Sequence, residues 1–426
     1  MIRNIFTNFT ARLGAAVMSF CMLLLTTHLL GKDVRGEIAA IQLGISIIHL
    51  ISDLAGGASL VYLVPRTSLR TLLLAGSAWA VLSAVATGWI MLRYFDVFPP
   101  NYEIEILIVG VLLSLHSTNQ NILLGQQRIT AYNILYISQA VIQLGVMLLS
   151  IFAFHQAGAY PFLYASIAGY GLCYLAGIIT VNRNAPIPKI AENRSILFLL
   201  FMNGVFTQGA NFTLKLVIGE NYSLLRKMPG GGDGAVGIYS TAYSLGETIL
   251  LLASSIAAIT LSHVSNQGDA STERIKVIRL SKISLALTVC AVIAFAFLPA
   301  GFYSWLLGGK DYEPVRQVFL TLSPGILLLS FGTVYSHYFS GAGKHFINFI
   351  SGVLSYTVIL IVAPMLINSS ALAGAGWSAS ITYVVLSLFV FLVFMLTGKG
   401  RKGEWKTLLP SAEDFQFVKN YLRKNK

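Results

Sequence analysis

Three ionisable residues, Asp53, Lys215 and Glu247, lie inside long apolar runs of the sequence. A charge at the centre of a membrane helix costs roughly 2.5–3.5 kcal/mol on insertion scales, so it is retained where it is paired, hydrated or functional. The two carboxylates can bind a cation or a proton, and the ammonium can attract an anion. The alternative is structural pairing between helices, since polar side chains also join membrane helices.

Polar residues form stripes along four of the apolar runs. Successive residues of a helix lie about 100° apart, so Gln42, Ser46, His49 and Asp53 fall within an arc of about 60°. His49 shares this stripe with Asp53, which favours proton handling, although a structural histidine is the other interpretation. The same arithmetic gives three further stripes: Arg12–Ser19–Thr26, Asn203–Thr207–Asn211–Lys215 and Tyr239–Tyr243–Glu247–Ser254. Stripes of this kind predict a polar cavity, with Ser, Thr and Asn also serving as helix contacts.

The elements that carry these stripes are apolar runs that fill most of the 426-residue chain. A bilayer core of about 30 Å needs about 20 apolar residues per helix. The composition agrees, with 55% hydrophobic and only 11% charged residues. We therefore expect an all-α polytopic membrane protein with twelve transmembrane helices, over residues 9–30, 38–63, 71–92, 104–123, 133–155, 160–181, 196–219, 238–262, 281–306, 317–340, 345–367 and 371–397.

The basic residues are distributed unevenly between the two sides of these spans. Most of the 29 Lys and Arg residues fall on the side of the N-terminus. This asymmetry predicts that both termini are cytoplasmic. The net charge of +12 follows from this topology. The chain has no basic face of the kind that nucleic acid needs, so we expect no nucleic-acid partner.

Short motifs recur in the two halves of the chain. Asp33-Val-Arg-Gly36 opens the second span and Asp233-Gly-Ala-Val-Gly237 opens the eighth, while Asn101-Tyr-Glu103 and Asp311-Tyr-Glu313 precede the fourth and tenth. The order predicts a six-plus-six parallel repeat. The predicted parts are an N-lobe at residues 1–195, a C-lobe at 196–398 and a cytoplasmic tail at 399–426 with an amphipathic interfacial helix.

Motifs for most enzyme chemistry are missing. The sequence has no phosphate-binding loop, no Cys/His cluster with metal-ligand spacing and no Gly-x-Ser-x-Gly elbow. Cys21, Cys173 and Cys290 all fall inside apolar runs, which argues against a disulfide framework. We expect a transporter, not an enzyme, with no cofactor and no bound metal.

The segment Asp53-Leu-Ala-Gly-Gly57, running into Leu60-Val-Tyr-Leu-Val-Pro65, together with the repeated Asp/Gly motifs, resembles the O-antigen and polysaccharide flippases of the Wzx type. Their superfamily also contains the MATE exporters and the lipid II flippases. The likeness extends over about residues 5–397, with Ala55 where the family has glycine. It implies flipping of an undecaprenyl-pyrophosphate-linked oligosaccharide to the periplasmic leaflet of a bacterial inner membrane, by alternating access coupled to H⁺ or Na⁺. It further implies membrane lipids as surroundings, and a polysaccharide polymerase and chain-length proteins as partners in lipopolysaccharide synthesis.

On this hypothesis the stripe residues divide into two groups. The cavity residues that contact substrate are Lys215, Arg12, Tyr239, Tyr243, Asn211 and Gln42, and the ion-coupling residues are Asp53, Glu247 and His49. Three alternatives stay open. The first is a MATE-like exporter of small cationic compounds, in which the carboxylates dominate the cavity. The second is a membrane glycosyltransferase or polymerase, which the short external loops disfavour. The third is a structural scaffold, which gives no reason for charges in mid-span.

Overall fold

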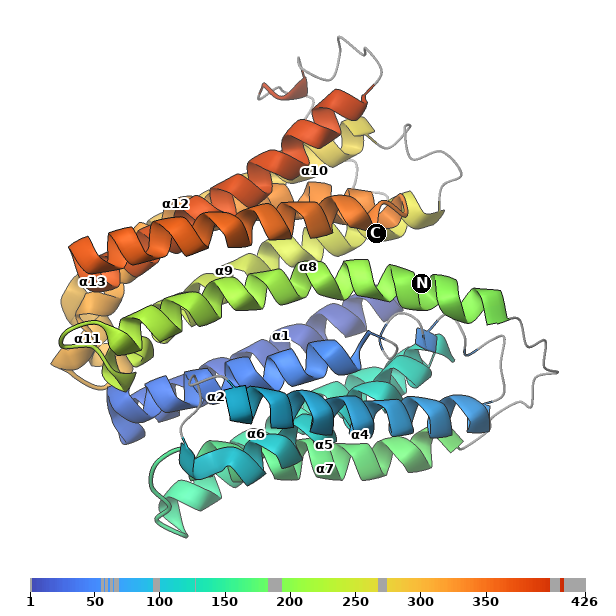
Figure 1. Cartoon of the computed structure of the whole chain (residues 1–426), viewed down its shortest axis with the longest axis horizontal. Coiled ribbons are helices and arrows are strands. Elements are labelled where there is room, and N and C mark those ends of the chain that lie inside the picture. Colours follow the sequence, from blue (N-terminus) through green and yellow to red (C-terminus); the bar gives the residue numbers. More distant parts are fainter. Residues whose placement is uncertain are drawn as a thin grey trace. The chain divides into compact units, whose positions relative to one another are not determined.

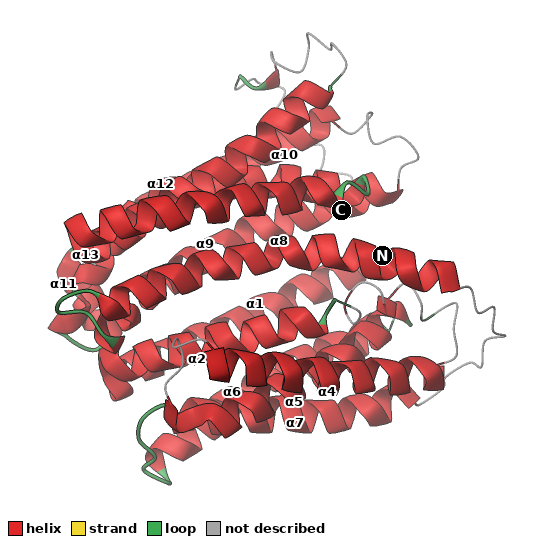
Figure 2. Cartoon of the chain, in the orientation of Figure 1, coloured by secondary structure: helices red, strands yellow, loops and turns green. Residues whose placement is uncertain are grey.

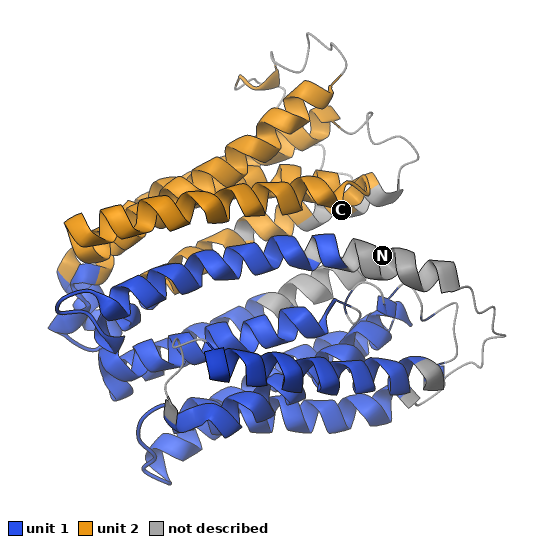
Figure 3. Cartoon of the chain, in the orientation of Figure 1, with its two compact units in different colours: residues 1, 3–241, 301–314 blue, residues 2, 242–300, 315–426 orange. Residues whose placement is uncertain are grey.

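The computed structural model describes residues 2–54, 57, 60, 61, 64, 69–94, 100–126, 128–182, 194–266, 274–398 and 407–409. Within these ranges the chain is helical and contains no strand (Figures 1 and 2). The chain divides into two compact units. Unit 1 comprises Arg3–Thr241 and Gly301–Pro314, and unit 2 comprises Ala242–Ala300 and Val315–Lys426 (Figure 3).

Unit 1 contains most of the helices of the first half of the chain. They are α1 (Ile2–Leu25), η1 (Thr26–Leu30), α2 (Gly31–Ser52), α4 (Leu69–Tyr94), η2 (Pro100–Tyr102), α5 (Glu103–Gly125), α6 (Ile129–Phe152), α7 (Tyr160–Asn182) and α8 (Arg194–Lys227). The start of α9 (Asp233–Asn266) and most of α11 (Ala300–Leu307) with η4 (Lys310–Tyr312) complete the unit. Unit 2 holds the rest of α9, with α10 (Arg274–Ala296), α12 (Pro314–Gly341) and α13 (His345–Thr397).

Nine helical segments of the described chain are long and apolar enough to cross a membrane. One of them, Leu13–Ser52, joins α1 to α2, and another is the 53-residue α13. A straight helix of that length would extend roughly 80 Å, more than twice the thickness of a bilayer core. Ala371, with φ 48° and ψ −120°, interrupts α13 at the first residue of the second of the two spans predicted there. The chain is therefore a multi-pass membrane protein.

The structure changes one predicted boundary. The second span was expected over residues 38–63, but α2 ends at Ser52, and Asp53 is the first residue after it. The compact units divide at residue 241, with α8 packed against α2 in unit 1, and the lobe boundary at residue 195 stays a prediction. The six-plus-six repeat stays a prediction. The predicted amphipathic helix of the tail and most of the linker at 181–195 lie outside the described residues.

Helix α2 has a central place in unit 1. It packs against α4, α5 and α8, while α7 packs against α5 and α6. Small residues permit these close contacts, since a Cβ at Gly110 of α5 would lie only 2.9 Å from Ile48 Cγ2 of α2. The polar stripe of α2 is consequently held between three other helices, at a fixed position within the unit.

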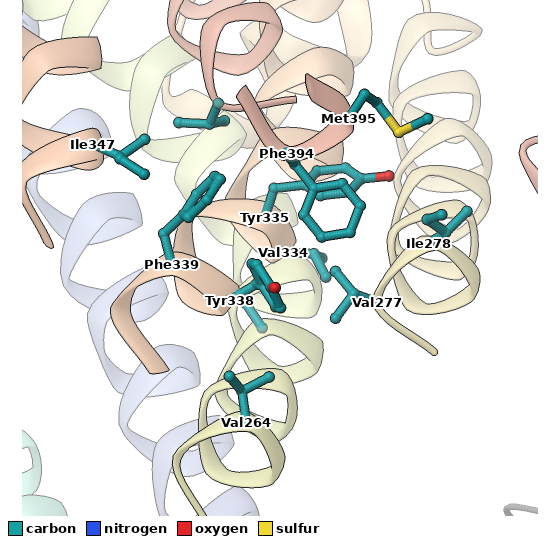
Figure 4. Close-up of a cluster of buried hydrophobic side chains, with 12 residues drawn as sticks. Val264, Val277, Ile278, Val334, Tyr335, Tyr338, Phe339, Ile347, Phe394 and Met395 are labelled. Carbon is teal, nitrogen blue, oxygen red and sulfur yellow. The ribbon is translucent and has the colours of Figure 1, made fainter. Parts of the chain in front are cut away.

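Unit 2 has an aromatic core. Tyr335, Tyr338, Phe339 and Phe394 are buried where α12 meets the last turns of α13, and Val277 and Ile278 of α10 pack against them (Figure 4). The rings of Tyr335 and Phe394 lie 4.8 Å apart between centroids. Apolar and aromatic burial is the dominant stabilising term for such a cluster.

Candidate functional site

The C-terminal end of α2 carries a pair of titratable side chains. His49 and Asp53 are one turn apart, and His49 Nε2 lies 3.6 Å from Asp53 Oδ2. Both side chains are partly exposed, at 25% and 19%. The i, i+4 spacing places them on one face of the helix, as the stripe predicted. The pair can therefore exchange a proton while remaining accessible.

Two residues of α5 extend this pair. Ser117 Oγ donates to Asp53 Oδ1 at 3.3 Å, and Asn121 Nδ2 donates to Ser117 Oγ at 3.2 Å. Ser117 and Asn121 are also four residues apart, so they lie on the face of α5 that meets α2. One oxygen of the Asp53 carboxylate thus faces His49, and the other is held by the serine hydroxyl.

Helix α4 fixes the end of α2 from another side. Trp79 Nε1 donates to the carbonyl of Ser52 at 2.9 Å, and Ser83 Oγ donates to Ser52 Oγ at 3.0 Å. The last carbonyls of a helix lack partners within the helix, so an indole N–H is a suitable donor for one of them. This contact fixes the position of the residue immediately before Asp53.

Helix α8 reaches the same place through Gln208. A Cβ at Gly57 would lie 3.4 Å from Asp53 Oδ2 and 3.6 Å from Gln208 Nε2, so both polar atoms border the space beside this glycine. Asn211 Nδ2 donates to Gln208 Oε1 at 3.1 Å, which leaves the amide nitrogen of Gln208 directed towards Gly57. Three helices therefore supply polar groups around one carboxylate.

A second histidine lies next to this group. His116 of α5 is buried, and its Nε2 is 2.8 Å from Gln120 Nε2. An amide NH₂ only donates, so His116 Nε2 accepts and carries no proton in this contact. The His116 ring lies 6.0 Å from that of Tyr170 between centroids. We call His49, Asp53, His116, Ser117, Gln120, Asn121 and Gln208 the Asp53 cluster.

The structure places the other predicted cavity residues in different surroundings. Gln42 is exposed, and its Oε1 accepts from Arg35 Nη1 at 3.5 Å. Asn211 is exposed. Lys215 is partly exposed and forms no ion pair within the described residues. The side chain of Arg12 lies outside the described residues.

The tyrosine and glutamate stripe of α9 is divided. Tyr239 is fully buried in unit 1, where its hydroxyl accepts from Asn221 Nδ2 at 2.9 Å and its ring meets Tyr222 edge-on. Its side chain is buried in this conformation, and its contact with substrate stays a prediction. Tyr243 and Glu247 belong to unit 2, where Glu247 is exposed.

The N-terminal end of α2 crosses the start of α9 at very short range. A Cβ at Gly36 would lie 1.8 Å from the Asp233 carbonyl oxygen, and one at Gly237 would lie 1.9 Å from that of Lys32. Only glycine fits at both positions, so the Asp/Gly motifs repeated in the sequence meet each other here. The crossing ties this end of α2 to α9 within unit 1.

Ion pairs surround the glycine crossing. Lys32 Nζ is 3.2 Å from Asp311 Oδ2, and Arg226 pairs with Asp233. Each pair contributes little by itself when it is exposed. Both pairs lie near the start of α2, at the end of this helix opposite the Asp53 cluster.

The sequence reasoning missed Ser117, Asn121 and Gln208. Their signal was present, because His116–Gln120 and Ser117–Asn121 are two polar pairs at a spacing of four in one predicted span. The one charge in that span, Glu105, lies at the other end of it, so these polar residues did not stand out from ordinary helix contacts.

None of the known family profiles matches this chain, and no curated protein matches it in sequence. Solved structures do match. The lipid II flippase MurJ, in an inward closed conformation, has a TM-score of 0.68 at 14% identity over 99% of this chain and 96% of its own. An inward-facing multidrug resistance MATE family transporter of the MOP superfamily has a TM-score of 0.66 at 15% identity, covering 89% and 97%.

A third match is a MOP superfamily transporter from Pyrococcus furiosus, with a TM-score of 0.66 at 12% identity over 93% of this chain and 94% of its own. All three of these proteins are transporters or flippases. Their similarity to this chain over nearly full length shows a common fold.

Proposed function

We propose that the protein flips an undecaprenyl-pyrophosphate-linked oligosaccharide from the cytoplasmic to the periplasmic leaflet of a bacterial cytoplasmic membrane. The flippase fold and the stripes of polar residues support this proposal. In the proposed topology the chain crosses the membrane twelve times, with α8 and the two halves of α13 among the crossings and both termini in the cytoplasm.

The surroundings of Lys215 are the observation that supports the proposed substrate class. This ammonium lies on α8, partly exposed and without an ion pair among the described residues. A charge left without a counter-ion in an apolar helix is stabilised when an anion arrives. A pyrophosphate headgroup supplies that anion, and Asn211, one turn earlier on the same helix, supplies a polar side chain beside it.

Transport then requires two conformations of the protein. Both the substrate and the coupling ion must shift the equilibrium between them. Binding of either ligand changes the affinity for the other by the same factor. His49 and Asp53 form the ion-coupling pair in unit 1, and Glu247 is a further candidate in unit 2.

One observation favours a second function. Glu247 is exposed, which suits a cation as well as a proton. A MATE-like exporter of small cationic compounds would use it together with Asp53 and would have no need of Lys215. The two functions therefore differ in their dependence on one basic and one acidic residue.

The test uses proteoliposomes that contain purified protein and a fluorescent undecaprenyl-pyrophosphate oligosaccharide. Label that becomes protected from an external quencher measures flipping, with and without a proton or sodium gradient. We expect protein-dependent redistribution that falls at least tenfold in Lys215→Ala. Lys227→Ala removes an exposed charge at the end of the same helix and should retain the activity. If the protein exports a cationic dye, and this efflux persists in Lys215→Ala but is lost in Glu247→Gln, the flippase proposal is rejected in favour of the exporter.

A further inference from the structure

The backbone hydrogen bonds of α2 change pattern at Asp53. The Asp53 amide donates to the His49 carbonyl at 2.9 Å, as in an α-helix, but the Leu54 amide donates to the Ile51 carbonyl at 3.2 Å, only three residues back. Bonds of this shorter kind tighten the turn at many helix ends. Helical bonding then resumes, since the Gly57 amide donates to the Asp53 carbonyl at 3.2 Å. Asp53 therefore lies at a short break between two helical segments.

The Ser52 carbonyl, at this break, is bound by a side chain of another helix. In an unbroken α-helix a carbonyl accepts from the amide four residues later. The Ser52 carbonyl accepts from Nε1 of Trp79, on α4, at 2.9 Å, and the Ser83 hydroxyl of α4 lies 3.0 Å from Ser52 Oγ. Ser52 is only 3% exposed, and a buried carbonyl needs a partner. Helix α4 thus supplies a donor to the last residue of α2.

Helix α4 also contacts the helix that carries Ser117. A Cβ at Gly76 of α4 would lie 3.2 Å from Thr118 Cγ2 of α5. Thr118 is the residue after Ser117, and Ser52 is the residue before Asp53. The same helix therefore packs beside both partners of the hydrogen bond between α5 and Asp53.

That hydrogen bond is sensitive to small displacements. Ser117 Oγ donates to Asp53 Oδ1 at 3.3 Å, which is longer than the usual distance between two oxygen atoms in a hydrogen bond. A modest shift of the end of α2 away from α5 would break it. The contact that fixes the end of α2 consequently controls whether the carboxylate reaches the serine.

We infer that Trp79 is a positioning residue for Asp53. Its indole N–H binds the Ser52 carbonyl, ends α2 at that residue and so places the Asp53 carboxylate within reach of Ser117. This inference rests on the proposed coupled transport, in which Asp53 serves ion coupling. It adds α4 to the helices on which the coupling depends, and Trp79 acts there through the backbone of Ser52.

The alternative is that Trp79 only packs between helices. Trp79→Phe separates the two roles, because phenylalanine keeps an apolar ring and lacks the N–H donor. The net effect of one such hydrogen bond is about fivefold in an equilibrium constant. Trp89→Phe is the matched control, since it makes the same change further along α4 at a side chain that is 60% exposed.

The first readout needs no substrate. Asp53→Cys and Ser117→Cys are combined in the full-length protein, and disulfide formation is followed in nanodiscs under mild oxidation. The native cysteines are first replaced by alanine: Cys21, Cys173 and Cys290. A disulfide forms only over a narrow range of Cβ–Cβ distances, so its rate reports how closely the two positions are held.

We expect Trp79→Phe to slow this disulfide formation by about fivefold, because it removes one hydrogen bond that holds the end of α2. Trp89→Phe should leave the rate unchanged. Ser52→Ala removes the hydroxyl beside Ser83 but keeps the carbonyl that Trp79 binds, so it should also keep the rate. An unchanged rate in Trp79→Phe, or an equal loss in Ser52→Ala, would overturn the inference.

The second readout is the coupling itself. In proteoliposomes the rate of redistribution of the labelled lipid-linked oligosaccharide is measured with and without an imposed gradient, and the ratio of the two rates is compared. Trp79→Phe should lower this ratio by about fivefold, since the misplaced carboxylate responds less to the gradient. A packing role would lower both rates together and leave the ratio unchanged, which would contradict the inference.

The two readouts also separate this inference from the proposed function. If even the unsubstituted protein moves no labelled lipid, the flippase proposal fails. The disulfide measurement still decides whether Trp79 positions Asp53, because it uses neither lipid-linked oligosaccharide nor a gradient.

Discussion

Polar residues are used differently in the two compact units. Among the described residues of unit 2, the buried polar groups other than Arg274 are hydroxyls, and most of them donate to backbone carbonyls, as when Ser284 Oγ donates to the Ser330 carbonyl at 3.0 Å and Ser380 Oγ to that of Thr321 at 2.6 Å. In unit 1 the Asp53 cluster brings together a carboxylate, two imidazoles and three amides, with two of the titratable groups partly exposed.

The difference distinguishes helix contacts from a working site. A hydroxyl that bonds to its own or a neighbouring helix is satisfied at little cost and needs no second state. Ionisable groups in a membrane interior are expensive, and a partly exposed pair can change its charge. Substitution of the buried hydroxyls of unit 2 is therefore expected to change stability, and substitution in the Asp53 cluster to change transport.

Arg274 should give the largest stability effect, because it is the one buried charge among the described residues of unit 2. Its guanidinium lies 3.8 Å from the Phe394 ring centroid and donates to the Phe394 carbonyl near the end of α13. Arg274→Ala should lower the free energy of unfolding by about 3 kcal/mol, from the lost cation–π contact and hydrogen bond. Thermal unfolding in detergent measures this loss.

Two variants sharpen the Arg274 prediction. Arg274→Lys keeps the charge but loses the planar stacking, so it should fall between the wild type and Arg274→Ala. Lys344→Ala removes an exposed charge just before α13, also in unit 2, and should change little. An Arg274→Ala protein of unchanged stability that fails in transport would contradict the structural role assigned to unit 2.

A smaller effect is expected at Tyr102, at the end of unit 1 opposite the Asp53 cluster. Its hydroxyl donates to Glu37 Oε2 and accepts from the Ala159 N–H, each at 3.2 Å. Tyr102→Phe should cost about 1 kcal/mol at pH 7. Burial raises the pKa of Tyr102 above its usual value near 10, so the folded protein holds this proton more tightly than the unfolded chain.

The pH dependence at Tyr102 follows from that direction. The stabilisation is fully present below pH 10 and is lost as the pH rises through the pKa of the folded state. The stability difference between wild type and Tyr102→Phe should therefore be constant from pH 6 to 9 and shrink above pH 10. Unfolding followed across this range checks it, and a difference that grows at alkaline pH would refute it.

The smallest effect concerns the backbone of α13. Ala371 has φ 48° and ψ −120°, a conformation that glycine adopts more readily than alanine. Ala371→Gly should stabilise unit 2 by about 0.5–1 kcal/mol. Ala373→Gly, two residues further in helical conformation, should instead destabilise it by about 1 kcal/mol. Equal effects of the two substitutions would mean that the interruption at Ala371 is not strained.

Much of this arrangement follows from periodicity. The apolar runs located the helices, and the spacing of His49 and Asp53 placed them on one face. Periodicity does not show what covers a face, so Tyr239 was expected in a cavity and is packed against Asn221 and Tyr222. The position of Asp53 after the last turn of α2, and the approach of Ser117 to it, depend on tertiary packing that no local pattern encodes.

The most direct test measures transport and stability together in Asp53→Asn and Ser284→Ala. The account predicts that Asp53→Asn abolishes gradient-driven redistribution of the labelled lipid-linked oligosaccharide and leaves thermal stability unchanged. Ser284→Ala should lower the free energy of unfolding by about 1 kcal/mol and leave transport intact. The central claim is that the Asp53 cluster serves transport, whereas the hydroxyls of unit 2 join helices. Full gradient-coupled transport by the Asp53→Asn protein would contradict this claim, and so would the loss of transport in a stable Ser284→Ala protein.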